Sequence, residues 1–172
     1  MKSFKQHIYE KLKVKRTTYT LFPKTKEELK QMIKDEISKN GNECSLNHID
    51  VSEITDMSSL FFESDFNGDI SNWDVSNVEN MAWMFKDSKF NGDISTWDVS
   101  KVESMYSMFY NSVFNGDISN WDVSNVENMR YMFYNSDFNG DISNWDVSSV
   151  ESMGYMFGYS PLEKNPPKWY KE

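Results

Sequence analysis

Apolar and polar residues recur along the chain with a period of 24 residues. Sixteen of the 24 positions are identical in four consecutive copies, in the pattern F-N-G-D-I-S-x-W-D-V-S-x-V-E-x-M-x-x-M-F-x-x-S-x. The four copies start at Phe66, Phe90, Phe114 and Phe138. A unit of this length cannot bury its own apolar residues, so copies must stack and enclose these residues between neighbours. The pattern therefore predicts a solenoid with one coil per repeat.

Each coil contains two apolar patterns. Trp73 and Val75 alternate with polar residues, which is typical of a strand with one buried face. Met81, Met84 and Phe85 follow at helical spacing. We therefore expect an α/β repeat solenoid with one short strand and one short helix or 3₁₀ turn per coil. A capping box formed by Ser76-x-x-Glu79 is an alternative that starts the helix earlier, and the residues alone do not separate the two interpretations.

Degenerate copies flank the four full repeats. The run from Ile49 to Phe61 lies one period before the Trp73 copy, and Trp169 lies 24 residues after Trp145. Asn67-Gly68 predicts the turn between copies, where Gly can adopt positive φ. The expected divisions are a basic segment with a capping helix, a degenerate first coil, four repeats and a C-terminal half coil, over residues 1–41, 42–65, 66–160 and 161–172.

A helix is expected over residues 24–41. Thr25 and Glu28 match a capping box, and Asn40-Gly41 matches a C-terminal stop. Its apolar stripe needs a partner, and we expect it to cap the open N-terminal end of the solenoid. The stripe consists of Leu29, Met32, Ile33 and Ile37.

Two earlier segments carry weaker patterns. Residues 2–13 place three apolar residues at helical spacing among lysines, which fits a helix that binds a membrane surface or an anionic partner, or one that packs on the cap or frays. Tyr19, Leu21 and Phe22, which precede Pro23, predict an edge strand.

The repeat resembles the BspA-like, mycoplasma-lipoprotein-type family, a leucine-rich-repeat-like group found in many bacterial surface proteins. The residues that carry this resemblance are W-D-V-S-N-V-E-N-M-x-x-M-F-x-x-S-x-F-N-G-D-I-S, and it covers roughly residues 42–160. The resemblance implies a leucine-rich-repeat-like solenoid that binds other macromolecules, with adhesion at the cell surface as one role. The chain as written lacks the secretory signal and lipobox cysteine of surface members.

Composition and charge restrict the partners. The 172 residues are 38% hydrophobic and carry a net charge of −9, so a globular core is expected. Residues 1–48 contain eleven Lys and Arg against six Asp and Glu, a charge of +5, whereas residues 49–172 contain seven against 21, a charge of −14. The acidic body disfavours nucleic acid, which is bound through cations. The chain as written has no apolar run long enough for a membrane span. Because it shows no signal peptide, we expect a cytoplasmic or virion-associated protein, while the resemblance leaves the cell surface possible.

No catalytic motif accompanies the repeat, so we expect neither an enzyme nor a cofactor. His7 and His48 have no Ser, Cys or carboxylate at motif spacing. The many acidic residues are copies of one another, whereas an active site is a single asymmetric arrangement. The single cysteine, Cys44, excludes an internal disulfide.

The N-G-D turns raise a second possibility, a calcium site. Stacked coils would place carboxylates in a ladder that a cation could neutralise. We favour the alternative that each Asp accepts hydrogen bonds from its own turn, while Asn67 and its copies bond to each other. The residues concerned are Asp69, Asp93, Asp117 and Asp141.

Positions that vary between copies are the best candidates for recognition. The repeated tryptophans and methionines are expected in the core because they alternate with polar residues or recur at helical spacing. The variable positions instead hold aromatic and basic residues, which are favoured in protein-binding hot spots. The candidate partner-binding residues are Trp83, Lys86, Tyr106, Tyr110, Arg130, Tyr131, Tyr134 and Tyr155.

We therefore expect a non-catalytic module that binds a protein of unknown identity. The alternatives are a BspA-type cell-surface adhesin and a structural or assembly component, for example of a phage particle. Self-association through the end coils is a further possibility, since Trp169 and the end coils could stack end to end.

Overall fold

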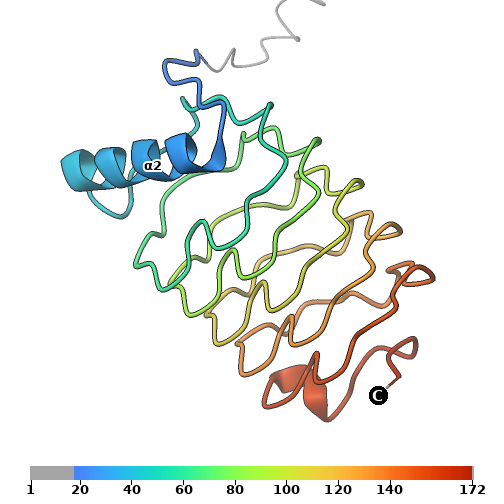
Figure 1. The fold of residues 1–172 in the computed structure, drawn as a ribbon. Helices are drawn as coiled ribbons and strands as arrows, with labels where there is room; N and C mark the ends of the chain where they lie inside the picture. Colours follow the sequence, from blue (N-terminus) through green and yellow to red (C-terminus); the bar gives the residue numbers. More distant parts are fainter. Residues whose placement is uncertain (1–17, 172) are drawn as a thin grey trace, which may run out of the picture.

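The repeat is the unit of the fold. The computed structural model describes residues 18–171, in which the chain winds through successive coils stacked on one another (Figure 1). Neighbouring coils meet at isolated parallel bridges between residues 24 apart, so the sequence period is also the structural register. These bridges join Asp56, Asn80, Ser104, Asn128 and Ser152 in series.

The coils contain turns where a strand was predicted. No strand longer than a single bridge residue occurs in residues 18–171, and the expected strand at Trp73 and Val75 is wrong. The Trp73 N–H donates to the Ile70 carbonyl at 3.1 Å and the Val78 N–H to the Val75 carbonyl at 2.9 Å, which closes two successive β-turns. Trp73 and Val75 are nevertheless buried between exposed polar neighbours, so the alternation itself is confirmed.

The short helix or 3₁₀ turn predicted over Met81 to Phe85 is present only as separate turns, closed by bonds such as that from the Met84 N–H to the Met81 carbonyl at 3.2 Å, and no helix begins at the Ser76-x-x-Glu79 box. The N–H groups of Met81, Trp83 and Phe85 donate to carbonyls of the next coil, each at 2.9 Å, instead of to residues four positions earlier. Trp83 also has a φ of 58°, in the left-handed region, which interrupts a right-handed helix. Bonding between coils thus replaces bonding along a helix.

Glycine in the repeat is required for close approach and not for positive φ. Of the described glycines only Gly41 has positive φ. A Cβ atom on Gly92 would lie 2.8 Å from the Phe90 ring, and one on Gly68 would lie 1.9 Å from the Cys44 carbonyl oxygen. The predicted reason for the N-G-D glycines is therefore wrong, because a side chain at these positions would collide with its neighbours.

Stacked aromatic side chains fill the interior. Each repeated tryptophan is about 4–5% exposed, and its indole N–H donates to a carbonyl of the preceding coil, as from Trp97 to Ile70 at 3.3 Å. Phe85 and Phe109 stack with ring centroids 5.6 Å apart, and Phe109 and Phe133 with centroids 5.7 Å apart. The tryptophans and most of the repeated methionines lie in the core, as predicted.

Helix α2 spans Lys26–Asn40 and lies at the N-terminal end of the stack (Figure 1). The Thr25 hydroxyl accepts the Glu28 N–H at 3.2 Å and Gly41 ends the helix, as predicted. The Glu28 carboxylate, however, accepts the Lys24 N–H at 2.7 Å. Leu29 is buried in the core of the coils, so α2 covers apolar surface of the first coil.

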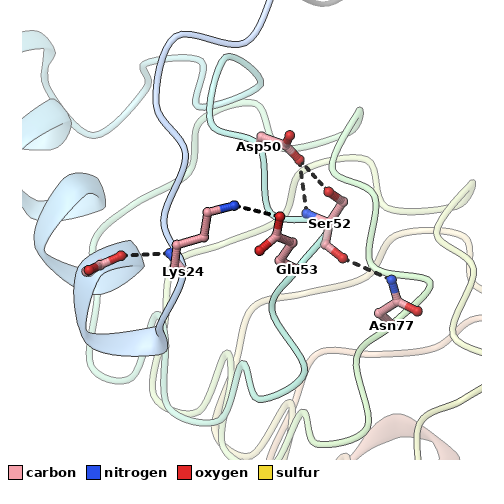
Figure 2. A network of polar contacts seen from close by, with 6 residues as sticks. Lys24, Asp50, Ser52, Glu53 and Asn77 are labelled. Atoms are coloured by element: carbon pink, nitrogen blue, oxygen red, sulfur yellow. Dashed lines mark hydrogen bonds and ion pairs between the residues drawn. The ribbon is translucent and has the colours of Figure 1, made fainter.

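Polar contacts also attach α2 and the residues before it to the first coil. Lys26 of α2 pairs with Asp56 at 3.1 Å. Figure 2 shows the ammonium of Lys24, which precedes α2, directed at Glu53 at 2.6 Å; in the same view the Asn77 amide donates to the Ser52 carbonyl at 2.9 Å and joins two coils. His48 lies 3.4 Å from Glu36 of α2, a pairing across the fold. Within residues 18–171 no helix is long and apolar enough to cross a bilayer.

The two ends of the described chain extend the stack by part of a coil. Leu21 forms a single parallel bridge with Ile49, so the predicted edge strand is reduced to one residue. At the other end a short 3₁₀ helix, η1, spans Pro161–Glu163. Beyond it Trp169 stacks on Trp145 at 6.3 Å and donates to the Ile142 carbonyl at 2.9 Å, which continues the tryptophan ladder. The predicted basic segment over residues 2–13 lies outside the described residues.

Candidate functional site

The variable side chains project from one turn segment of each coil. In residues 81–87 the invariant Met81, Met84 and Phe85 face the core, whereas Trp83 and Lys86 lie at the surface. Trp83 has positive φ, as do Ser107, Tyr131 and Tyr155 at the equivalent positions of the following coils. Left-handed backbone is uncommon for bulky residues, so inter-coil hydrogen bonding holds these side chains in an orientation that they would not otherwise favour.

The rings of Trp83, Tyr131 and Tyr155 form one row with Tyr106, which precedes the buried Ser107 in the intervening coil. Trp83 meets Tyr106 edge to face with centroids 5.1 Å apart, and Tyr106 meets Tyr131 edge to face at 6.1 Å. Tyr131 then stacks on Tyr155 at 5.4 Å. Arg130 lies over the Tyr131 ring, with its guanidinium carbon 5.4 Å from the centroid. Each ring therefore contacts the next along the axis of the stack.

A second row runs beside the first. The Lys86 ammonium lies between two rings, 5.4 Å from the centroid of Phe62 and 4.9 Å from that of Tyr110. Tyr110 stacks on Tyr134 at 5.1 Å, and Tyr134 meets Tyr159 edge to face at 5.2 Å. Partial burial, together with the neighbouring Tyr159 phenol, raises the pKa of Tyr134 above its usual range.

The two rows contact each other through Tyr131 and form one surface, which we call the aromatic face. The centroid of Tyr131 lies 5.6 Å from that of Tyr134 and 6.5 Å from that of Tyr110. The structure brings together all eight residues that the sequence singled out. The aromatic face comprises Phe62, Trp83, Lys86, Tyr106, Tyr110, Arg130, Tyr131, Tyr134, Tyr155 and Tyr159.

Phe62 and Tyr159 are the two members that were not among the candidates. Phe62 belongs to the degenerate first coil, one period before Lys86, and Tyr159 occupies a variable position of the last full repeat. Phe62 and Trp83 are each 40% exposed, Tyr155 is 56% exposed and Tyr159 is 71% exposed. Extending the variable position of Lys86 into the degenerate first coil would have identified Phe62, and Tyr159 could be read directly from a variable position of the last repeat.

The aromatic face has little depth. Ser59, Phe62, Trp83 and Lys86 line an open hollow of about 240 Å³ at its N-terminal end. Enclosed sites for drug-sized ligands are commonly about 300–1,000 Å³. One border of the face is polar, because the Asn111 amide donates to Asp87 at 2.6 Å and the Asn135 amide to Asn111 at 2.7 Å. The surface suits contact with another surface better than it suits enclosure of a small molecule.

The aspartates of the N-G-D turns bond within their own turns, as expected. Asp93 accepts the Ser95 N–H at 3.0 Å and the Ser95 hydroxyl at 2.7 Å, and the same arrangement recurs in the other copies. These bonds lower the pKa of Asp93 and outweigh the repulsion from Asp69 and Asp117. Hydrogen bonds from the following serine likewise lower the pKa of Asp117 and of Asp141.

Asn67 and its copies form a ladder, as expected. The Asn67 side chain accepts the Asn91 N–H at 2.8 Å, and Asn91 in turn accepts the Asn115 N–H at 2.9 Å. Within the described residues, no group of three or more His, Cys, Asp or Glu is placed to hold a metal ion. The N-G-D turns thus have a structural role that their own hydrogen bonds account for.

Comparison with known proteins gives a family without an assigned function. The family model described as "Mycoplasma protein of unknown function, DUF285" matches residues 27–137 and, in an overlapping match, residues 89–170. Neither a curated protein nor a solved structure matches the chain. The two matched ranges together cover all but the first residue of α2, the four full repeats and the C-terminal half coil as far as residue 170. The chain therefore belongs to the family of mycoplasma proteins of unknown function, DUF285.

Proposed function

We propose that the chain is a BspA-like, leucine-rich-repeat-like solenoid that binds a protein partner through the aromatic face and has no catalytic activity. The observation that carries this proposal is the pair of contacting rows of surface rings, with Arg130 over a ring of the first row and Lys86 between two rings of the second. Tyr, Trp and Arg are the residues most enriched in protein-binding hot spots. The rest of the coil surface is a repeated acidic unit that supplies solubility.

Three features favour a protein over a small ligand. The aromatic face is open, and the hollow at its N-terminal end is small, at about 240 Å³. Its rings contact each other, as Tyr110 contacts Tyr134, so their side chains are already restricted in the free chain. Binding of a partner therefore costs less side-chain entropy. The face also differs from coil to coil: one position of the repeat holds Trp83, Ser107 and Tyr131 in successive coils. These differences allow the face to distinguish one partner, or one register of a partner, from another.

Capture of a partner tests the proposal. The immobilised chain is incubated with lysate of its native cell, and retained proteins are identified by mass spectrometry. We expect Tyr110→Ala with Tyr134→Ala to abolish capture, and Tyr110→Phe with Tyr134→Phe to retain most of it because the rings remain. Asp98→Ala with Asp122→Ala, on a different side of the coil, serves as the matched control and should capture normally.

The opposite pattern would overturn the proposal. If the Asp98 and Asp122 variant loses the partner while the Tyr110 and Tyr134 variant retains it, the acidic surface is the binding site. Each variant is first compared with the parent by urea denaturation, so that loss of capture is attributed to the surface and not to unfolding.

A further inference from the structure

Five Asn-Gly dipeptides occur in the chain, and four of them lie in the identical run F-N-G-D-I-S that begins each repeat. Asparagine is among the thermolabile residues of proteins, because its carboxamide can be lost by deamidation. A following glycine favours the reaction, since it has no Cβ to shield its backbone nitrogen. The four copies share one local sequence, so differences in their reactivity report the surrounding fold. The dipeptides begin at Asn40, Asn67, Asn91, Asn115 and Asn139.

Deamidation joins the side chain of asparagine to the backbone of the next residue. The glycine nitrogen loses its proton to a base in solvent and forms a bond to the asparagine Cγ, while the bond from Cγ to Nδ2 breaks and ammonia leaves. Water then opens the five-membered imide at either carbonyl, which gives aspartate or isoaspartate. One water is consumed, one ammonia is released, and nothing is oxidised or reduced. The carboxamide must therefore turn toward the following nitrogen before it can react.

In the inner coils a hydrogen bond holds this carboxamide toward the next coil. The Asn67 side-chain oxygen accepts the Asn91 N–H at 2.8 Å, and the Asn91 oxygen accepts the Asn115 N–H at 2.9 Å. The Asn115 oxygen accepts the Asn139 N–H at 2.8 Å. The stack itself thus restrains three of the four repeat asparagines, because turning toward the following glycine would break this bond.

Asn40 is restrained in a different way, at the end of α2. The Gly41 N–H donates to the Ile37 carbonyl at 2.8 Å, so the nitrogen that would attack is already engaged. The Asn40 carboxamide also donates to Glu36 at 3.0 Å. Reaction at this dipeptide requires the C-terminal turn of the helix to open.

Asn139 is the end of the asparagine ladder. It is exposed, and its carboxamide makes no hydrogen bond within residues 18–171. The residue one period later, Glu163, lies in η1 and donates its N–H to the Ser160 carbonyl at 3.1 Å, so it does not continue the ladder. The Gly140 N–H likewise has no acceptor in the described part of the chain. Both reacting groups are therefore unrestrained at this dipeptide.

We propose that Asn139 is a site of spontaneous deamidation and that it reacts ahead of the other Asn-Gly sites of the folded chain. The inner copies must break one hydrogen bond to a neighbouring coil before they react, which corresponds to roughly a fivefold difference in rate. The product adds a carboxylate near Asp137 and Asp141, and isoaspartate also lengthens the main chain by one methylene. The aromatic face takes no part in this reaction, so the site is tested independently of the proposed function.

Peptide mapping of the incubated full chain tests the proposal. The folded chain is kept at mildly alkaline pH, and samples taken at intervals are digested with trypsin. Cleavage after Lys89, Lys101 and Arg130 places Asn91, Asn115 and Asn139 in separate peptides. Mass spectrometry follows the mass increase from replacement of NH₂ by OH in each. We expect Asn139 to be modified at least about fivefold faster than Asn91 and Asn115, with isoaspartate among its products.

Two controls assign the difference to the fold. In concentrated urea the three sites should react at similar rates, because they share the same local sequence. Asn139→Gln should remove the fast reaction and leave the slower sites unchanged, since the longer side chain would have to close a six-membered ring. The proposal is overturned if Asn91 or Asn115 reacts as fast as Asn139 in the folded chain, or if the difference persists in urea. It is also overturned if Asn139 stays unmodified while the unfolded chain reacts, or if aspartate forms there without isoaspartate.

Discussion

Trp121 provides a quantitative test of how the stack is held together. It is 4% exposed, and its indole N–H donates to the Ile94 carbonyl of the preceding coil at 3.1 Å. That carbonyl also accepts the Trp97 N–H at 3.2 Å, so it keeps one partner when the indole is removed. Trp121→Phe should therefore cost only the net worth of one hydrogen bond, about 1 kcal/mol. The space left by the smaller ring adds roughly 1 kcal/mol at about 24 cal/mol per Å³ of cavity.

The expected loss for Trp121→Phe is thus about 2 kcal/mol in the free energy of unfolding. Trp169→Phe is the matched comparison, because Trp169 makes the same bond, at 2.9 Å, but lies partly exposed at the end of the stack. It should lose about half as much, since less apolar surface is enclosed there. Urea denaturation followed by the fluorescence of the remaining tryptophans measures both values. The reasoning is refuted if Trp121→Phe changes stability by less than about 0.5 kcal/mol, or if Trp169→Phe is the more damaging change.

Three further predictions test the local structure of the coil. Gly68→Ala should lower the free energy of unfolding by roughly 1–3 kcal/mol or more, because its Cβ would overlap the Cys44 carbonyl. Gly154→Ala, whose Cβ would meet only Arg130 at 3.9 Å, should change it by less than about 0.5 kcal/mol. Thermal melts compare the two variants, and equal effects would contradict the packing argument. Asn111→Val should be less stable than Asn111→Gly by about 1–2 kcal/mol in urea denaturation. Both variants lose the amide hydrogen bonds to Asp87 and Asn135, but only Val is strained at a φ of 50°. Equal stability of the two variants would show that this backbone is not constrained. The depressed pKa values of Asp93, Asp117 and Asp141 mean that their turn bonds stabilise the fold above the ordinary aspartate pKa and lose this effect as the pH falls through the lower, folded-state values. The urea concentration at the midpoint of unfolding should fall less steeply with decreasing pH in the variant with all three replaced by Asn than in the parent. An equally steep fall in the variant would refute the claim that these carboxylates make stability depend on pH.

The period of the repeat predicts the register and the core, because both depend on which positions are identical. Trp73 and its copies were predicted to lie inside, because they are invariant, large and apolar and lie between polar neighbours. The cap of α2 was also predictable, because Thr25, Glu28 and Gly41 specify the helix ends through local chemistry. These features rest on short-range patterns.

The conformation within the coil was harder to predict because turns and strands can produce the same alternation. Asp69 and Asp74 each cap a turn by accepting from the serine two residues later, at 3.0 Å and 3.2 Å. The repeated D-x-S spacing indicated two successive turns. The turn bonds that it specifies determine the backbone here, although the alternation of apolar and polar residues also fits a strand. The helix predicted at Met81 is reduced to separate turns for another reason: its N–H groups bond to the next coil, and no local pattern reports that competition.

The aromatic face was predicted from variation between copies, but its backbone was not. Trp83 and Tyr131 have φ of 58° and 57°, although bulky residues rarely adopt this conformation. Asp87, Asn111 and Asn135 occupy the neighbouring turn position with positive φ, and Asp and Asn tolerate this conformation, so these residues are a sequence hint for it. Phe62 was missed because it lies in a degenerate copy. Too few of the invariant residues are present there to align it with the variable surface positions of the full repeats.

Photo-crosslinking in the native cell tests the central claim, that the aromatic face binds a protein, most directly. A benzophenone amino acid replaces Tyr131, at the centre of the face, in one variant and Asp98, on the acidic surface, in the other. The account predicts a discrete crosslinked protein from position 131 and none from position 98. A crosslink from position 98 alone would contradict it, as would the absence of any crosslink from position 131 in a folded variant.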